Sequence, residues 1–254
     1  MTNPPDPTGD GRPILQPVSA GSSGNIFLLA PDLVVKLGHL GWPHHVEHEH
    51  KVYEALGPHP RIVEYLGTWN DINRSAVLRY HPRGCLRQVL QRAADNEVPV
   101  PRRKWAVQLA EALVFIHSKG VVHGDINASN VLVTDHDDVL LCDFAGAALN
   151  GEPPVVACYE IRHFRPRSSD DEWVSRSEAD DLFALGSLLF ELYTGEKPFK
   201  DKEENEVEKL YKRGIFADTS RIPAEVEALI NGCWTEKYTN ALELLQDVSH
   251  LATS

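Results

Sequence analysis

The spacing of apolar residues changes near position 80, and this change constrains the fold more than any other feature of the sequence. From Ile14 to about Arg79, short apolar runs alternate with Gly, Pro, Asn and Asp, as in strands separated by turns. One helical segment interrupts them between Val46 and Leu56. After residues 81–84 most periodic segments are helical. The sequence therefore predicts an α+β fold, with a small β-rich N-terminal lobe and a larger, mainly helical C-terminal lobe.

The predicted elements divide the chain as follows. Strands are expected at residues 25–29, 33–37, 61–66 and 75–80. Helices are expected at Leu86–Ala94, Lys104–Ser118, Ala179–Thr194, Val207–Gly214, Ala224–Trp234 and Ala241–Leu251. Residues 1–12 are rich in proline, have no apolar stretch and are expected to form a disordered tail. Residues 13–254 are expected to form one domain, with the N-lobe at about 13–79, a hinge at about 79–83 and the C-lobe at about 84–254.

Composition excludes two classes of function. A formal net charge of −12 argues against a nucleic-acid surface, because phosphate contacts need clustered Lys and Arg. No run of apolar residues is long enough to span a membrane, so no membrane association is expected. The four cysteines show no paired spacing, which is typical of reduced thiols in the cytoplasm or, alternatively, the nucleus. The sequence carries no signal for an oligomeric state.

A glycine-containing turn and a lysine inside an apolar run suggest phosphate binding. Gly21 and Gly24, in the turn that follows Ser19, leave room for backbone amides to approach a triphosphate, although plain β-turns share this composition. Lys36 lies in the run LVVKL, where an unpaired ammonium group would be costly. Glu49, on the predicted helix, is its natural partner. The alternative is an edge-strand lysine and a solvated glutamate.

The segments VVHGDINASNVLV and VLLCDFAGAAL hold three polar residues at defined offsets. Asn130 lies five residues after Asp125, and Asp143 lies eighteen after Asp125, each bounded by apolar strands. Phosphoryl transfer requires an acid that orients a hydroxyl group, and an Asn and an Asp that hold divalent cations against phosphate oxygens. This pattern therefore predicts a phosphotransferase.

With these motifs in this order, the chain resembles the eukaryotic protein-kinase family, including its divergent fungal-type Ser/Thr members, from about Val18 to Leu251. The resemblance implies a bilobal kinase fold, ATP and Mg²⁺ as cofactors, and a protein substrate with a hydroxyl side chain, with Ser or Thr favoured. The catalytic residues that it implies are Asp125 as the base, Lys36, Glu49 and Asn130. The nucleotide-binding residues that it implies are Ser19, Gly21, Gly24, Ile26, Val34, Lys36, Leu78, Tyr80 and Asp143. The magnesium ligands that it implies are Asn130 and Asp143.

A later segment, Asp181–Phe199, looks like the central helix of the family and the loop that follows it. In the family, an aspartate of this helix anchors the catalytic loop from below, and Asp181 takes its place here.

The sequence departs from the family at five positions: Ser19, Gly124, Asn127, Ala145 and Arg167. Asn127 stands where Ser/Thr kinases carry a lysine that neutralises charge on the transferred phosphoryl group. Arg167 stands where the family has a glutamate paired with an arginine before the last helix, and residues 234–241 contain no arginine. Both halves of that ion pair are therefore absent together, which an intact fold tolerates.

The usual phosphorylation switch is missing as well. Gly124 replaces the arginine that binds an activation-loop phosphate, and Tyr159 is the only hydroxyl residue between Ala147 and Arg165. We therefore expect a kinase that works without activation-loop phosphorylation.

Three alternatives stay open at this point. The departures are also typical of a pseudokinase that serves as a scaffold. The His123-Gly124-Asp125 motif is also favoured by small-molecule phosphotransferases such as aminoglycoside kinases. Finally, His44-His45-Val46-Glu47-His48 contains an H-x-x-E-H string that is found in one class of zinc peptidases.

Overall fold

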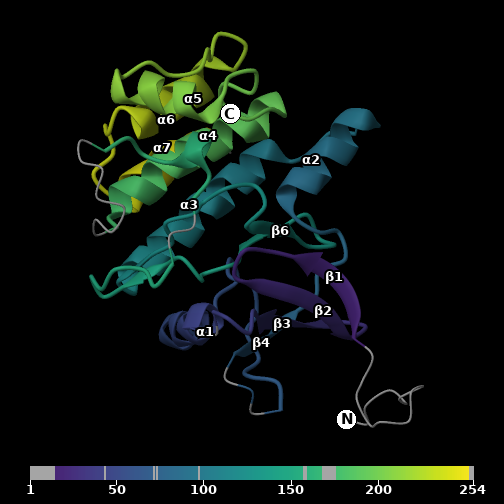
Figure 1. The fold of residues 1–254 in the computed structure, drawn as a ribbon. Coiled ribbons are helices and arrows are strands. Elements are labelled where there is room, and N and C mark those ends of the chain that lie inside the picture. The colour runs from purple at the N-terminus through teal and green to yellow at the C-terminus, as the bar shows by residue number, and fades with distance from the viewer. Residues whose placement is uncertain are drawn as a thin grey trace.

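The computed structural model describes residues 15–42, 44–70, 72, 74–96, 98–156, 159–167 and 176–251. The predicted tail, residues 1–12, lies outside this part of the chain. Within it, no helix has both the length and the apolar character needed to cross a membrane. Figure 1 shows two lobes, a sheet with one helix beside it and a larger group of helices.

The N-terminal lobe is an antiparallel sheet in the order β1-β2-β3-β4. Its strands are β1 (Gln16–Ala20), β2 (Gly24–Ala30), β3 (Leu33–Gly38) and β4 (Ser75–Arg79). Helix α1 (His44–Leu56) follows β3 and contacts both β3 and β4. Its buried residues, Val46, Glu49, Val52, Tyr53 and Leu56, recur at helical spacing, which confirms the predicted helix and its buried face.

The segment at residues 61–66 was expected to be a strand, and this prediction was wrong in part. It forms only isolated bridges, Ile62 with Leu141 and Tyr65 with Leu78. Its first half bonds to the C-terminal lobe, where Val63 N donates to Leu141 O at 3.0 Å. Its second half bonds to β4. Because the segment divides its hydrogen bonds between two lobes, it cannot continue either sheet.

The C-terminal lobe is built from six α-helices within the described residues: α2 (Leu86–Asp95), α3 (Arg102–Ser118), α4 (Glu178–Thr194), α5 (Glu204–Lys212), α6 (Ala224–Trp234) and α7 (Ala241–Leu251). All six were predicted, with α6 and α7 at the expected bounds. Helix α5 was expected at Val207–Gly214, but it begins at Glu204 and ends at Lys212, before Gly214 with its positive φ of 68°.

Helix α4 is the centre of this lobe. Every residue from Asp180 to Leu192 is buried, and the helix contacts α3 and α6. A helix that is buried all round belongs to a core. Ser177 and Asp180 form a capping box at its N-terminus, and Gly195, with φ of 76°, ends it. The residues at both ends of α4 are therefore fixed in position.

Short strands hold the loops between the lobes. Strand β5 (Val121–Val122) pairs with β8 (Ala148–Leu149), and β6 (Val131–Val133) pairs with β7 (Val139–Leu141). A 3₁₀ turn, η1 (Ile161–His163), packs against α4 and α5. The loop from β5 to β6 and the segment after β7 are consequently held beside each other.

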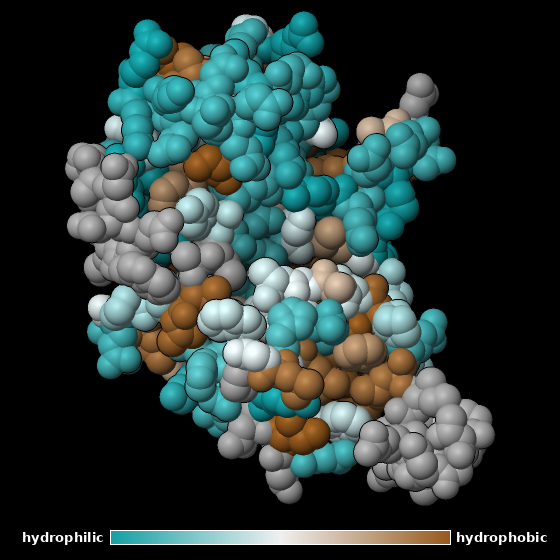
Figure 2. All heavy atoms as spheres, in the orientation of Figure 1, coloured by the Kyte–Doolittle hydropathy of each residue, from teal (hydrophilic) through white to brown (hydrophobic). Residues whose placement is uncertain are grey.

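Among the described residues of the N-terminal lobe, four large hydrophobic side chains are exposed: Val18, Leu40, Trp42 and Leu66. Figure 2 shows hydrophobic side chains gathered over this lobe, whereas the helical lobe is mostly hydrophilic on the face shown. Every residue of β1 is exposed. The edge of the sheet therefore contributes little to the core.

Candidate active site

Lys36, Glu49 and Asp143 form one ionic cluster between the lobes. Lys36 Nζ lies 2.7 Å from Glu49 Oε2 and 2.7 Å from Asp143 Oδ1. Lys36 is 4% exposed and Glu49 0%. Burial by itself would lower the pKa of Lys36, but the carboxylates of Asp143 and Glu49 outweigh it and raise the pKa. Likewise burial would raise the pKa of Asp143, and Lys36 outweighs burial and lowers it. The expected Lys36–Glu49 pair is present, and Asp143 joins it.

Helix α1 is bonded to the segment after β7 at two further points. Glu49 Oε1 accepts a hydrogen bond from Phe144 N at 3.2 Å, and His48 Nε2 lies 2.7 Å from Ala147 O. Asp143 has φ of 65°, in the left-handed region that non-glycine residues seldom adopt. Such backbone strain persists only where the surroundings hold it, and here Lys36 does so. Sequence reasoning considered His48 only as part of a possible zinc-binding string and did not indicate this contact.

The loop after β5 presents Asp125 between two amides. Asn127 Nδ2 donates to Asp125 Oδ1 at 2.9 Å, and Asn130 Nδ2 donates to Asp125 Oδ2 at 2.9 Å. Burial raises the pKa of Asp125 to about 6. The carboxylate is thus ionised at pH 7 and basic enough to accept a proton. Asn127, which replaces the family's lysine, holds this carboxylate in place.

Asp181 anchors the same loop from α4, as the sequence predicts. Its Oδ2 accepts from His123 N and its Oδ1 from Gly124 N, both at 2.8 Å. His117 Nε2 also lies 2.9 Å from Asp181 Oδ2, a contact that no sequence signal indicated. Burial would raise the pKa of Asp181, but the hydrogen bond and charge of His117 outweigh it and lower the pKa.

The glycine turn has a structural role that the sequence did not reveal. A Cβ atom at Gly24 would lie 2.5 Å from Leu37 O, so the close approach of β2 and β3 requires glycine there. Gly21 N bonds to Gly24 O at 3.0 Å and closes the turn. Ser23, which sequence reasoning missed, is buried and its Oγ lies 3.5 Å from Asp143 Oδ1. The turn therefore folds over the ionic cluster.

The other predicted nucleotide-binding residues lie on the sheet or beside it. Val34 stands opposite Leu78 in the β3–β4 register, and Ile26 stands opposite Lys36 in the β2–β3 register. Val34 and Lys36, two residues apart on one strand, share a face of the sheet. Ser19 lies in β1 and is exposed. Tyr80 follows β4 and its N donates to Asp32 O at 2.8 Å.

The site next to Gly124 is occupied by an arginine from another part of the chain. Arg176, which precedes α4, is 7% exposed and lies over the rings of Tyr159 and Phe164, with its Cζ 5.9 and 5.2 Å from their centroids. A Cβ atom at Gly124 would stand 3.2 Å from Arg176 Nε. Gly124 itself brings no charge, as the sequence indicates, but the Arg176 guanidinium group places a positive charge beside it.

An ion pair still joins the region around Arg167 to the loop before α7, but its two charges have exchanged places relative to the family's pair. Arg167 bonds to the buried Asp180 at 2.8 Å, and Arg165 Nη2 lies 2.9 Å from Glu236 Oε1, in the loop before α7. The family's glutamate–arginine pair is missing, as expected. An arginine on the activation segment and a glutamate before the last helix join the same two regions instead.

The histidines of α1 do not converge. His48 contacts Ala147 O, His50 contacts the hydroxyl group of Tyr65, and His44 lies 3.5 Å from Glu47. Within the described residues, no three His, Cys, Asp or Glu side chains gather as a metal site. The zinc hypothesis therefore has no support in the structure.

Asp143 and Asn130 fit a magnesium ion that is bound jointly by protein and phosphates. Mg²⁺ prefers oxygen ligands and often takes only one or two protein side chains, with phosphates and water completing its shell. The Asp143 carboxylate and the Asn130 amide oxygen supply ligands of that class, and Lys36 lies beside Asp143 to balance further negative charge.

A model of the family described as "Protein tyrosine and serine/threonine kinase" matches residues 43–249. The chain belongs to this protein kinase family. The bilobal α+β architecture described above is the fold expected of such a kinase.

Several relatives of this chain carry kinase names, and two of the following three are named serine/threonine-protein kinases. The chain is 29% identical to Serine/threonine-protein kinase 12 of Arabidopsis thaliana, over 70% of this chain and 41% of the relative. It is 30% identical to Aurora kinase of Candida glabrata, over 76% of this chain and 54% of the relative. It is 32% identical to Serine/threonine-protein kinase 1 of Lymantria dispar multicapsid nuclear polyhedrosis virus, over 70% of this chain and 68% of the relative. The chain thus spans about half or less of the first two relatives.

Proposed function

We propose that this chain is a protein kinase that transfers the γ-phosphate of ATP to a Ser or Thr hydroxyl group of a protein in the cytoplasm. The observation that carries the proposal is the Asp125 carboxylate, held by Asn127 and Asn130 next to a closed Lys36–Glu49–Asp143 cluster. The relatives that are named serine/threonine-protein kinases support the choice of hydroxyl group.

Each residue has a distinct task in this function. Lys36, fixed by Glu49, binds the α- and β-phosphates of ATP. Asp143 and Asn130 hold Mg²⁺, which when bound neutralises charge on the phosphate oxygens. Asp125 orients the substrate hydroxyl group and accepts its proton. Asn127 brings no positive charge to the transferred group, so we expect slower turnover than in kinases with a lysine there.

The pseudokinase alternative is less well supported. A protein that has lost catalysis has no need to keep a buried ion pair, because replacement of the whole pair by apolar residues is often neutral for stability. Here Lys36 and Glu49 are paired at 2.7 Å, and Asp125 has both carboxylate oxygens bonded. A small-molecule phosphotransferase would contain the same cluster, so the acceptor must be tested directly.

The test is phosphotransfer from radiolabelled ATP with Mg²⁺ to a Ser/Thr peptide library, a Tyr peptide library and aminoglycosides, with Asp125→Asn as the control. We expect label on Ser/Thr peptides from the wild type and at least 100-fold less from Asp125→Asn. Label on aminoglycosides alone would identify a small-molecule kinase. Nucleotide binding without label on any acceptor would favour the pseudokinase.

A further inference from the structure

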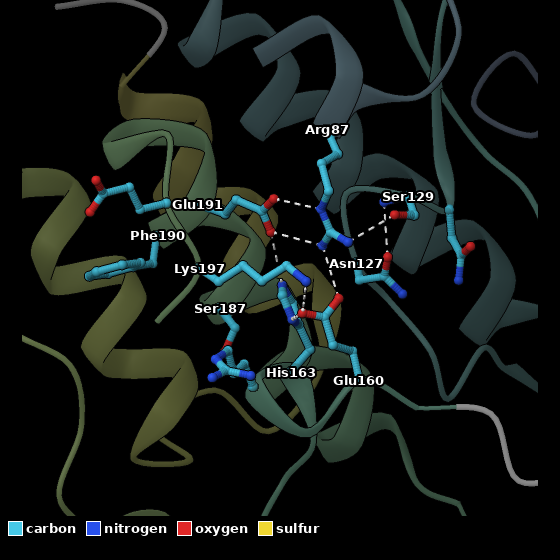
Figure 3. Close-up of polar contacts among 12 residues, drawn as sticks. Arg87, Asn127, Ser129, Glu160, His163, Ser187, Phe190, Glu191 and Lys197 are labelled. Carbon is cyan, nitrogen blue, oxygen red and sulfur yellow. Dashed lines mark hydrogen bonds and ion pairs between the residues drawn. The ribbon is translucent and has the colours of Figure 1, made fainter. Parts of the chain in front are cut away.

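Arg87 of α2 lies at the centre of a polar cluster that joins three parts of the C-terminal lobe. Its guanidinium group bonds to both carboxylate oxygens of Glu191 on α4, at 2.9 and 3.2 Å. The same group bonds to Glu160, before η1, at 2.9 Å and to Ser129 Oγ at 2.9 Å. Figure 3 shows Arg87 pointing into the space between these three partners.

The cluster continues to the proposed catalytic base. Ser129 N donates to Asn127 Oδ1 at 2.9 Å, and Asn127 Nδ2 donates to Asp125 Oδ1 at 2.9 Å. The backbone of Arg87 also donates to Ala128 O at 3.0 Å. A continuous series of hydrogen bonds therefore runs from Arg87 to Asp125 through the residue that replaces the family's lysine.

The charges in the cluster are balanced without a phosphate. Two carboxylates, Glu160 and Glu191, face two cations, Arg87 and Lys197, whose Nζ lies 2.6 Å from Glu160 Oε1. Glu191 is almost fully buried, and a carboxylate in that position needs a paired, hydrogen-bonded partner. The bidentate contact with Arg87 supplies one. Glu160 thus gives the activation segment a permanent negative charge that is held in place.

We propose that Arg87 is a positioning residue, which fixes Asp125 by joining Ser129 and Asn127 of the catalytic loop to Glu160 of the activation segment and Glu191 of α4. This inference rests on the proposed kinase function. Through this connection, ordering of the activation segment is coupled to the alignment of Asp125. Glu160 takes the role that an activation-loop phosphate has in kinases that are regulated by phosphorylation.

The experiment compares five single variants with the wild type, and one of the five is a control outside the cluster. Arg87→Met removes the centre of the cluster, and Glu160→Gln removes one charge with little change in shape. Ser129→Ala removes the hydroxyl group that Arg87 bonds, and Ser129→Thr keeps it. Arg61→Met is the matched control, because Arg61 also lies between two carboxylates, Glu111 and Asp138, and is similarly exposed (21% against 29% for Arg87).

Kinetics give the first readout. We expect kcat to fall at least tenfold in Arg87→Met and at least threefold in Glu160→Gln and Ser129→Ala, with KM for ATP within twofold of wild type. Ser129→Thr and Arg61→Met should stay within twofold in both. The double variant Arg87→Met/Glu160→Gln should be no slower than Arg87→Met alone, since both break the same connection.

Hydrogen exchange gives a readout that does not depend on activity. In Arg87→Met the amides of residues 127–130 and 159–164 should exchange at least tenfold faster than in the wild type, while the amides of α4 exchange at the wild-type rate. In the control Arg61→Met, exchange in all of these segments should match the wild type. If the wild type transfers no phosphate, the proposed function fails, and exchange alone decides this inference. Unchanged exchange at residues 127–130 would overturn it, as would equal kinetics for Ser129→Ala and Ser129→Thr. If Arg87→Met does not fold, the Ser129 pair serves the same purpose.

Discussion

Arg176 lies against Gly124 so closely that a Cβ atom at position 124 would stand 3.2 Å from its Nε atom and 3.2 Å from Gly146 O. Gly124 has φ of 76°, in the region that favours glycine. Two separate costs therefore oppose a side chain here: backbone strain and displacement of a buried guanidinium group.

Restoring a side chain at Gly124 should destabilise the fold. We expect Gly124→Ala to lower the free energy of unfolding by about 2 kcal/mol, and Gly124→Arg by at least as much. Gly151→Ala is the control, because Gly151 has φ of 81° but no described atom within 4 Å of a Cβ. It should cost only the backbone term of about 1 kcal/mol. Urea unfolding measures both, and equal losses would mean that Arg176 moves aside without cost.

Lys36 and Glu49 should behave as one unit in catalysis. Lys36→Met leaves the buried Glu49 carboxylate without its cation, and Glu49→Gln leaves Lys36 with Asp143 as its one remaining carboxylate in the cluster, so each should lower kcat/KM by at least tenfold. The double variant should lose much less than the product of the two factors. Steady-state rates of all four proteins complete the cycle. Multiplicative losses would show that the pair does not act together.

Magnesium-dependent nucleotide binding should require Asp143. We expect ATP with Mg²⁺ to raise the melting temperature of the wild type, and Asp143→Ala to abolish most of that shift, because the carboxylate supplies oxygen ligands to the ion. Asp138→Ala, which removes a carboxylate outside the cluster, should keep the shift. No shift in the wild type at millimolar ATP would contradict the nucleotide site itself.

His163 should make the fold less stable at acid pH. It is buried near Glu160, Glu191, Arg87 and Lys197, and burial lowers its pKa to about 4. The unfolded chain, with a histidine pKa of about 6.5, takes up the proton first, so stability falls as pH falls from about 6.5 to 4. The loss for this residue is about 2 kcal/mol at pH 5.

His163→Leu should remove that part of the pH dependence. Urea unfolding of both proteins at pH 7 and pH 5 measures the difference. If the wild type and the variant lose the same amount of stability between these two pH values, then His163 is protonated in the folded state and its burial is not as described.

Activation-loop phosphorylation should be unnecessary. Tyr159→Phe keeps the ring beneath Arg176 and removes only the hydroxyl group, and Glu160 already carries a fixed charge. Initial rates of Tyr159→Phe and of phosphatase-treated wild type should match the untreated wild type within threefold. A tenfold drop in either, about 1.4 kcal/mol of barrier, would show that a phosphate on this segment has a role.

Much of the site could be predicted because its residues are fixed by local order. Asp125, Asn130 and Asp143 lie within eighteen residues, each next to a short apolar strand, so spacing alone places them in neighbouring loops. Lys36 and Glu49 were paired because a lysine within an apolar strand needs a nearby carboxylate. The helices of the C-terminal lobe were predictable because their apolar faces recur every three to four residues.

By itself, the sequence determined the α+β class and the order of the elements, and it offered Glu49 as the partner of Lys36. The family resemblance then pointed to the anchoring aspartate of α4. Only the tertiary structure decided which long-range partner each remaining charge takes. Arg176 reaches Gly124 from 52 positions away, and Arg87 reaches Glu191 from 104 positions away. Apolar periodicity fixes which face of a helix is buried, but a charged side chain bonds to whatever group packing brings within 3 Å. The physical reason for the division is that periodicity is local, whereas charge pairing depends on how whole elements pack.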